Sequence, residues 1–207
     1  MTDLFKREWG KIKTSYCGVR GIFSIYWKAY GGIGALLRSP YLHFTALLLL
    51  PVTINTWAAG EWWKDPIAAL PNLLGFSLAG FAMFIGFGDE RFRELLAEPE
   101  DNPSQPTIYV GLCSTFVHFI VVQVLAFIWA YLSQSLNYVS DVMDPIRAWL
   151  PFLNALNGGV GYGLFLYALM SILAATMHVF RISTMYANYK KAGKKKSSAN
   201  NASEDGQ

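Results

Sequence analysis

Hydrophobic residues form four long runs along this chain, and polar segments separate them. The runs cover roughly residues 41–59, 66–88, 107–132 and 150–182. Each run is continuous rather than alternating, which favours helices over strands. Each is long enough to cross about 30 Å of hydrocarbon, which takes about 20 helical residues. Since a helix satisfies its own backbone hydrogen bonds where water is absent, the pattern predicts an all-α membrane protein with four transmembrane helices.

The segment before the first run has a different character. Residues 1–40 are basic and rich in aromatic side chains, and apolar positions recur at helical spacing from Ile22 to Leu37. This spacing predicts an N-terminal amphipathic helix lying in the membrane interface. An amphipathic helix packed on a cytosolic domain is the alternative. Pro51 lies inside the first run and is expected to kink that helix.

The helical pattern of the second run continues past Gly88 into charged residues, which predicts a cytoplasmic extension of helix two that ends near Pro99. The chain then divides into a basic amphipathic segment and a four-helix transmembrane bundle, followed by a disordered basic tail rich in Lys, Ser and Asn. These parts cover residues 1–40, residues 41–185 with a cytoplasmic loop at 89–106, and residues 186–207.

The distribution of charge predicts the orientation. Charged residues make up 15% of the 207 residues, well below the roughly one quarter of soluble domains. Of the 17 Lys and Arg residues, all but Lys64 and Arg147 lie in the N-terminal segment, the loop at 89–106 or the C-terminal segment. The positive-inside rule therefore predicts a multi-pass protein of the plasma membrane with both termini in the cytoplasm. Cys17 and Cys113 are expected to be free thiols.

Candidate chemistry is sparse. The sequence contains no catalytic arrangement, no metal-ligand spacing and no cofactor motif, so we expect no enzyme, no cofactor and no nucleic-acid partner. His118 and Gln123 are polar residues near the middle of the third run. Such residues face the bundle interior, either as interhelical hydrogen bonds or as pore-lining or proton-sensing groups. The sequence leaves both interpretations open.

Small residues recur at the start of the fourth run. Ala155, Gly159 and Gly163 are four residues apart and share one helix face, where two helices can approach closely. This face is a candidate contact for a homo-oligomer. Residues 160–163 also match part of the potassium-channel filter, but a glycine precedes them where that motif has Thr, and no outer loop follows.

Two charged surfaces suggest partners. An acidic group after the second run is a candidate docking site for a basic cytosolic protein, or a solvated surface with local ion pairs. A lysine cluster in the tail is a candidate contact with anionic membrane lipids, worth about 1 kcal/mol per residue. The acidic residues are Asp89, Glu90, Glu94 and Glu98, and the lysines are Lys194, Lys195 and Lys196.

Residues 75–91, GFSLAGFAMFIGFGDER, and residues 118–123, HFIVVQ, resemble small four-helix membrane subunits of prokaryotic anti-phage defence systems such as Kiwa. The resemblance implies action beside a cytosolic effector and carries no catalytic residue. We therefore expect a non-enzymatic oligomeric membrane sensor or scaffold that recruits a cytosolic partner in bacterial antiviral defence. An oligomeric pore or ion channel, and a membrane enzyme or transporter, are the alternatives.

Overall fold

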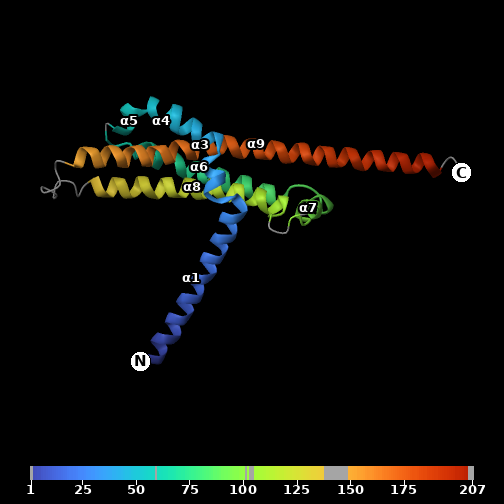
Figure 1. Cartoon of the computed structure of the whole chain (residues 1–207), viewed down its shortest axis with the longest axis horizontal. Coiled ribbons are helices and arrows are strands. Elements are labelled where there is room, and N and C mark those ends of the chain that lie inside the picture. The colour runs from blue at the N-terminus through green and yellow to red at the C-terminus, as the bar shows by residue number, and fades with distance from the viewer. Residues whose placement is uncertain (1, 59, 101, 103–104, 138–148, 205–207) are drawn as a thin grey trace.

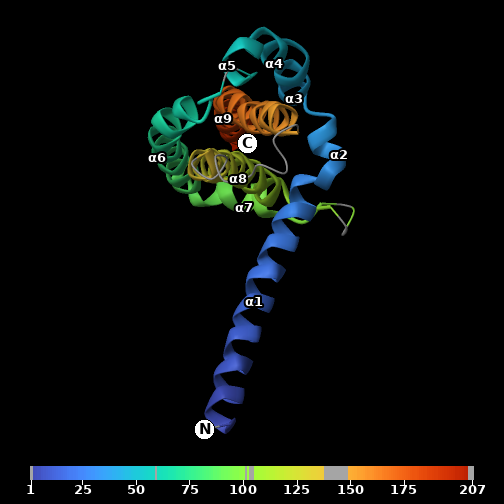
Figure 2. The same cartoon turned by 90° about the vertical axis from the view of Figure 1, so that its left-hand side faces the viewer.

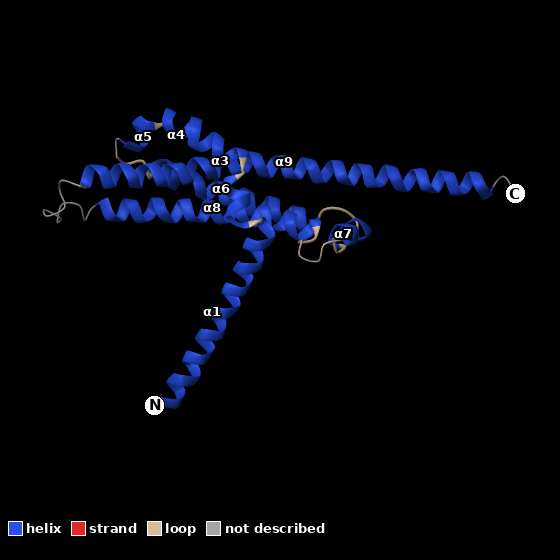
Figure 3. Ribbon diagram, viewed as in Figure 1, coloured by secondary structure: helices blue, strands red, loops and turns tan. Residues whose placement is uncertain are grey.

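The computed structural model describes the whole chain except residues 1, 59, 101, 103–104, 138–148 and 205–207, and its side-chain description also leaves out residues 2–6, 137, 150 and 196–204. The described residues form helices joined by turns, with no strand among them (Figure 3). This confirms the all-α class. The sequence also predicts an outer loop at residues 133–148. Its first residues belong to a helix that ends at Asn137, and residues 138–148 fall outside the described residues.

Three long helices form the centre of the molecule. They are α6 (Lys64–Gly86), α8 (Ile108–Asn137) and α9 (Leu150–Glu204), which run side by side (Figure 1) and group as a triangle when viewed along their length (Figure 2). Within the described residues, these three are the helices long and apolar enough to cross a membrane. Large apolar side chains point outward from them, including Phe76 at 78% exposure and Met83 at 76%. A multi-pass membrane protein explains this exposure, because lipid replaces water on those faces.

The first apolar run does not form the single helix that we predicted. It comprises α3 (Pro40–Phe44), the π-helical turn η1 (Thr45–Leu49), α4 (Leu50–Val52) and α5 (Ile54–Ala58). Pro51 cannot donate a backbone hydrogen bond, and the wide π turn precedes it. The helix then breaks at Thr53, whose hydroxyl donates to the Leu49 carbonyl at 2.9 Å. The indole of Trp57 donates to the Leu50 carbonyl at 2.9 Å and satisfies the acceptor that the break exposes.

The N-terminal segment also divides differently. Our prediction placed one helix from Ile22 to Leu37, but the chain forms α1 (Thr2–Tyr30) and α2 (Gly32–Leu37). The break occurs because Gly31 and Gly32 have φ angles of 98° and 62°, a region that glycine reaches without steric cost. Helix α1 projects away from the three central helices, and its C-terminal end meets them (Figure 2).

The predicted continuous extension of helix two is instead a turn followed by a separate helix. Helix α6 ends at Gly86, and a separate helix, α7 (Glu90–Ala97), follows after a turn at Gly88, whose φ is 86°. Asp89 caps α7 by accepting a hydrogen bond from the backbone N–H of Phe92 at 2.9 Å. The turn lets α7 bury Phe92 and Leu96 against the bundle, which a straight extension would have left in water.

The C-terminal tail is helical where we predicted disorder from residue 186 onward. Helix α9 continues to Glu204 and projects well beyond α6 and α8 (Figure 1). Contacts with α7 support its middle: the ring of Phe92 lies 5.0 Å from that of Tyr186 and 5.6 Å from that of Tyr189. Lysine and alanine, frequent after this point, also have high helix propensity.

Candidate functional site

His118 lies where α1 meets the bundle. It is 3% exposed. Its Nδ1 is hydrogen-bonded to the hydroxyl of Tyr26 on α1 at 3.0 Å, and its Nε2 to the hydroxyl of Tyr167 on α9 at 3.2 Å. The ring of Tyr30 stacks on the imidazole with centroids 3.9 Å apart. His118 therefore joins three helices, and both ring nitrogens have a partner.

Sequence reasoning missed the tyrosines that complete this group. We assigned the aromatic residues near the end of α1 to the lipid interface, and no local signal paired them with α8. Burial, followed by the nearby Tyr167, raises the pKa of Tyr26 to about 12. Burial likewise raises the pKa of Tyr30 above its ordinary value. Both hydroxyls stay protonated at neutral pH, so the group is a neutral hydrogen-bonded contact that docks α1.

Gln123 belongs to a different contact. It is fully buried and pairs with Ser77 of α6. The Ser77 hydroxyl donates to Oε1 at 3.1 Å, and Nε2 donates to the Ser77 oxygen at 2.9 Å. The two polar residues that we grouped as one candidate site thus bind different helices, and no hydrogen bond connects them.

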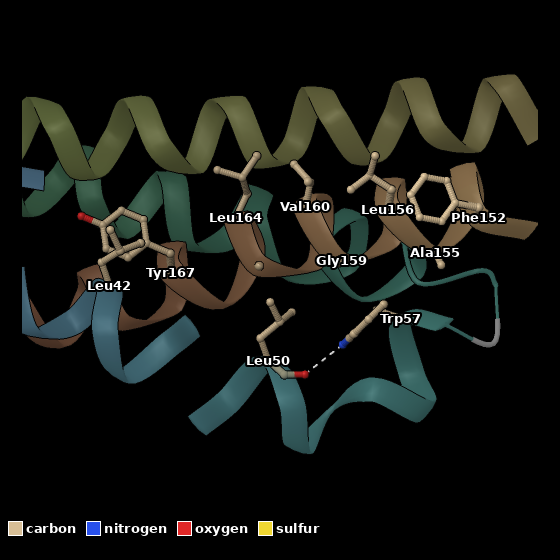
Figure 4. A pocket seen from close by; sticks show the side chains of 11 residues that line it. Leu42, Leu50, Trp57, Phe152, Ala155, Leu156, Gly159, Val160, Leu164 and Tyr167 are labelled. Atoms are coloured by element: carbon tan, nitrogen blue, oxygen red, sulfur yellow. Dashed lines mark hydrogen bonds between the residues drawn. The ribbon is translucent and has the colours of Figure 1, made fainter. Parts of the chain in front are cut away.

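The small-residue face of α9 packs against its own chain. A Cβ atom at Gly159 would lie 3.5 Å from the Trp57 ring, and one at Gly163 would lie 3.7 Å from Leu50. Segment α4–α5 therefore packs against the glycines, which stay half-buried. Together with Ala155 they line an open groove of about 550 Å³ (Figure 4). The homo-oligomer stays a prediction, and the glycines that suggested it already have an intramolecular partner.

The same stretch excludes the filter-like interpretation. Residues 160–163 lie inside α9, where carbonyls accept hydrogen bonds from the next turn and do not face an ion. Gly161, which we did not single out, has the tightest surroundings: the rings of Trp62 and Trp129 leave no room for a Cβ. The sequence contained no sign of this contact, because the two indoles come from distant parts of the chain.

Polar side chains pair across the helices at this end of the bundle. Asn157 Oδ1 accepts from the Trp129 indole at 2.9 Å and from the Ser133 hydroxyl at 3.2 Å. The Tyr162 hydroxyl donates to Asp65 at 3.1 Å and connects α9 to the start of α6. These bonds satisfy the polar groups locally and fix how α6, α8 and α9 pack.

The acidic residues of α7 divide into two groups. Asp89 forms an ion pair with Lys190 of α9 as well as capping α7. The Lys190 hydrogen bond, followed by that from the Phe92 N–H, lowers the pKa of Asp89 below its ordinary value. Glu90, Glu94 and Glu98 are exposed. The local ion-pair interpretation therefore fits Asp89, and the three glutamates remain accessible to a partner.

A groove of about 690 Å³ lies between α7 and α9, and we call it the α7–α9 groove. Most of its lining residues are apolar, and two of them carry carboxylates. The apolar lining includes Leu95, Ile108, Met185 and Tyr189, and the acidic lining residues are Glu98 and Glu100. Leu95 is 45% exposed, an open apolar side chain directly beside acidic ones. Sequence reasoning found the charges but not the groove, because α9 was expected to end before it.

Lys194 and Lys195 lie on the part of α9 that projects beyond α7, and both are exposed. The side chain of Lys196 falls outside the described residues. Lipid contact by this lysine cluster stays a prediction.

Neither metal-binding clusters nor disulfides mark a further site in the described part of the chain. No group of three or more His, Cys, Asp or Glu side chains there is placed to hold a metal ion. Cys17 and Cys113 are free thiols. Comparisons with protein-family models, curated proteins and solved structures find no match to this chain.

Proposed function

We propose that this chain is a non-enzymatic sensor or scaffold of the bacterial inner membrane that recruits a basic cytosolic protein. The α7–α9 groove is the observation that carries the proposal. An apolar side chain of the partner would cover Leu95, while its Lys or Arg residues would pair with Glu98 and Glu100. Such a pattern, an apolar centre with complementary charge around it, is typical of protein interfaces.

The proposed placement has four membrane crossings. Besides α6, α8 and α9, the broken segment from Pro40 to Ala58 would cross as well. Its start shares a pocket with His178 of α9, and its Trp57 lies against Gly159. The stretch of α9 from Gly159 to His178 measures about 28 Å at the α-helical rise. That length is close to the roughly 30 Å of hydrocarbon, which supports a crossing despite the breaks.

Four crossings would place both termini and α7 on one side, which the positive-inside rule assigns to the cytoplasm. Helix α1 would then lie in the cytoplasmic interface. Its apolar side chains Ile12, Tyr16 and Val19 are 46–74% exposed, and lipid would cover them there.

The buried polar residues favour this function over a pore. His118 and Gln123 each have hydrogen-bond partners on neighbouring helices. This supports a packing role over lining a water-filled path. The resemblance to anti-phage membrane subunits makes antiviral defence the proposed setting. Loss of protection against phage infection when the gene is deleted from its natural locus would support that setting, and unchanged protection would contradict it.

Purification from native membranes, with and without charge reversal at the groove, tests the proposal. We expect at least one soluble, basic protein to co-purify with the wild-type chain. Its amount should fall about tenfold or more in a Glu98→Lys/Glu100→Lys variant and at high salt, because salt screens such contacts. Glu8→Lys, an acidic residue on α1, is the matched control and should retain it. If every co-purifying soluble protein stays at wild-type levels in the double variant, the proposal is wrong.

A further inference from the structure

A pocket of about 280 Å³ with several polar side chains lies between the end of α1, the α2–α3 turn, α8 and α9. Its polar lining includes Arg38, Ser39, Thr115, Ser171 and His178, together with the tyrosines Tyr30, Tyr41 and Tyr167. The volume is several times the roughly 30 Å³ that one water occupies in the liquid, so the pocket holds more than a single water. Among the described residues, no carboxylate lines it. We call it the Arg38 pocket.

The hydrogen-bonding groups of the Arg38 pocket favour an acceptor. The Nδ1 atom of His178 is buried and has no hydrogen-bond partner among the described residues. Arg38 uses its Nε to donate to the Gly34 carbonyl at 2.9 Å, which leaves its terminal amino groups for a ligand. A buried polar atom without a partner is unfavourable, so a ligand that accepts a hydrogen bond there would stabilise the site.

Several other hydroxyls of the lining already have partners. Tyr167 is hydrogen-bonded to His118 at 3.2 Å, and Tyr30 and Ser39 are hydrogen-bonded to Tyr167. Thr115 donates to the Gly111 carbonyl at 3.0 Å, and Ser171 donates to the Ala168 carbonyl at 2.6 Å. Their protons are therefore used within their own helices. A pocket with a guanidinium and an imidazole as donors, and no carboxylate among its described lining residues, favours an anionic ligand.

The position of the Arg38 pocket along the helices indicates where that anion comes from. Phe116, which follows Thr115 on α8, stacks on Phe84 of α6 with centroids 5.2 Å apart. Helix α6 ends two residues later at Gly86, and the charged residues of α7 follow. The end of the pocket at Thr115 therefore lies near the level where the apolar part of the bundle gives way to polar residues, and its other end reaches toward Tyr167. Lipid headgroups occupy this level of a membrane.

We infer that the Arg38 pocket binds the phosphate of a phospholipid headgroup. The planar guanidinium of Arg38 matches two phosphate oxygens, a geometry that arginine favours. His178 donates its Nδ1 proton to the same group from the floor of the pocket. The lipid chains extend along the outward faces of α8 and α9. Basic pockets of this kind between helices recognise lipid headgroups in other membrane proteins.

Native mass spectrometry of the delipidated full-length protein, titrated with phosphatidylglycerol, tests this inference. We expect one lipid to bind the wild-type chain, with affinity about tenfold weaker in Arg38→Gln and in His178→Phe. The exposed Arg38 side chain leaves folding intact when replaced, and Phe keeps the ring packing at residue 178. Arg181→Gln removes a neighbouring charge that does not line the pocket, and should bind the lipid as the wild type does.

Two further ligands identify what is recognised. Diacylglycerol, which lacks the phosphate, should bind weakly and equally to all variants. Inorganic phosphate should compete only at far higher concentration than the lipid. Wild-type lipid affinity in Arg38→Gln would overturn the inference, as would diacylglycerol binding as tightly as phosphatidylglycerol. Inorganic phosphate that binds through Arg38 and resists displacement by the lipid would show that the pocket serves a soluble anion instead.

Discussion

Replacing Tyr26 with Phe removes one hydroxyl from the contact that docks α1 on the bundle. Tyr26 is 9% exposed, and its hydroxyl lies 3.0 Å from Nδ1 of His118. The phenyl ring keeps the packing against neighbouring aromatic rings, so the change isolates the hydrogen bond. After the change, Nδ1 of His118 lacks its partner from α1.

The expected effect is about 1 kcal/mol. Interhelical hydrogen bonds in membrane proteins contribute about 0.6 kcal/mol on average and up to about 1.7 kcal/mol, and a buried bond in general contributes about 1 kcal/mol. This free energy corresponds to about a fivefold larger population of molecules in which the end of α1 has left the bundle. His118→Leu removes the hydrogen bonds to Tyr26 and Tyr167 and the stacking contact with Tyr30. We expect a larger effect of about 2 kcal/mol, which corresponds to a roughly thirtyfold larger open population.

Limited digestion with trypsin in lipid nanodiscs measures this population. Lys28 lies between the two docked tyrosines, so cleavage after it requires α1 to open there. Arg20 lies on the exposed part of α1 and gives an internal reference in the same digest. When opening is fast relative to cleavage, the ratio of the two rates follows the open population. We expect this ratio to rise about fivefold in Tyr26→Phe.

Tyr16→Phe is the matched control, because Tyr16 is on the same helix and 74% exposed. It should leave the ratio unchanged. If Tyr26→Phe and His118→Leu give the wild-type ratio, the hydrogen-bonded group does not hold α1 on the bundle, and the reasoning is refuted.

Three further predictions concern local geometry and charge. Gly88→Val should destabilise the protein by about 1–3 kcal/mol in thermal unfolding, because Gly88 has a φ of 86° and a Cβ would lie 2.8 Å from a neighbouring aromatic ring. Gly86→Ala is the control and should be neutral, because the space around Gly86 is open. Equal unfolding of the two variants would contradict this prediction. Gly161→Ala should lower the free energy of unfolding by about 1–3 kcal/mol through overpacking. Gly159→Ala makes an ordinary contact at 3.5 Å and should be tolerated. A larger loss of stability in Gly159→Ala than in Gly161→Ala would contradict the packing of the two indoles around Gly161. The pKa of Asp89 is lowered from 3.8, so its ion pair and cap stabilise the fold above that pH. The stabilisation is lost as the pH falls through the lowered pKa. Asp89→Asn should remove this part of the acid dependence, and identical acid unfolding curves of variant and wild type would argue against it.

The apolar runs predicted the central helices because hydropathy is a local property of the chain. Helices α6 and α8 begin and end within a few residues of the predicted limits. Glycine breaks were harder to predict. Gly88 stands in a pattern that is helical on both sides, and its positive φ depends on Asp89 capping a new helix and on Phe92 finding a buried position.

Contacts between distant residues explain the rest. His118 was identified as a buried polar residue, but its partner Tyr26 is 92 positions away, and sequence pattern alone does not pair them. The far part of α9 is held partly by the ion pair of Lys190 with Asp89, which lies 101 positions earlier in the chain. Composition in the tail favoured disorder, and a long-range contact of this kind has no local signature.

The most direct test of the account concerns the segment from Pro40 to Ala58. The three long helices alone would place the two ends of the chain on opposite sides of the membrane, because three crossings are an odd number. Fusions of a cytoplasm-dependent fluorescent reporter and a periplasm-dependent phosphatase to each terminus measure the sides independently. We predict fluorescence and no phosphatase activity at both termini, as four crossings require. Phosphatase activity at one terminus and fluorescence at the other would contradict the account.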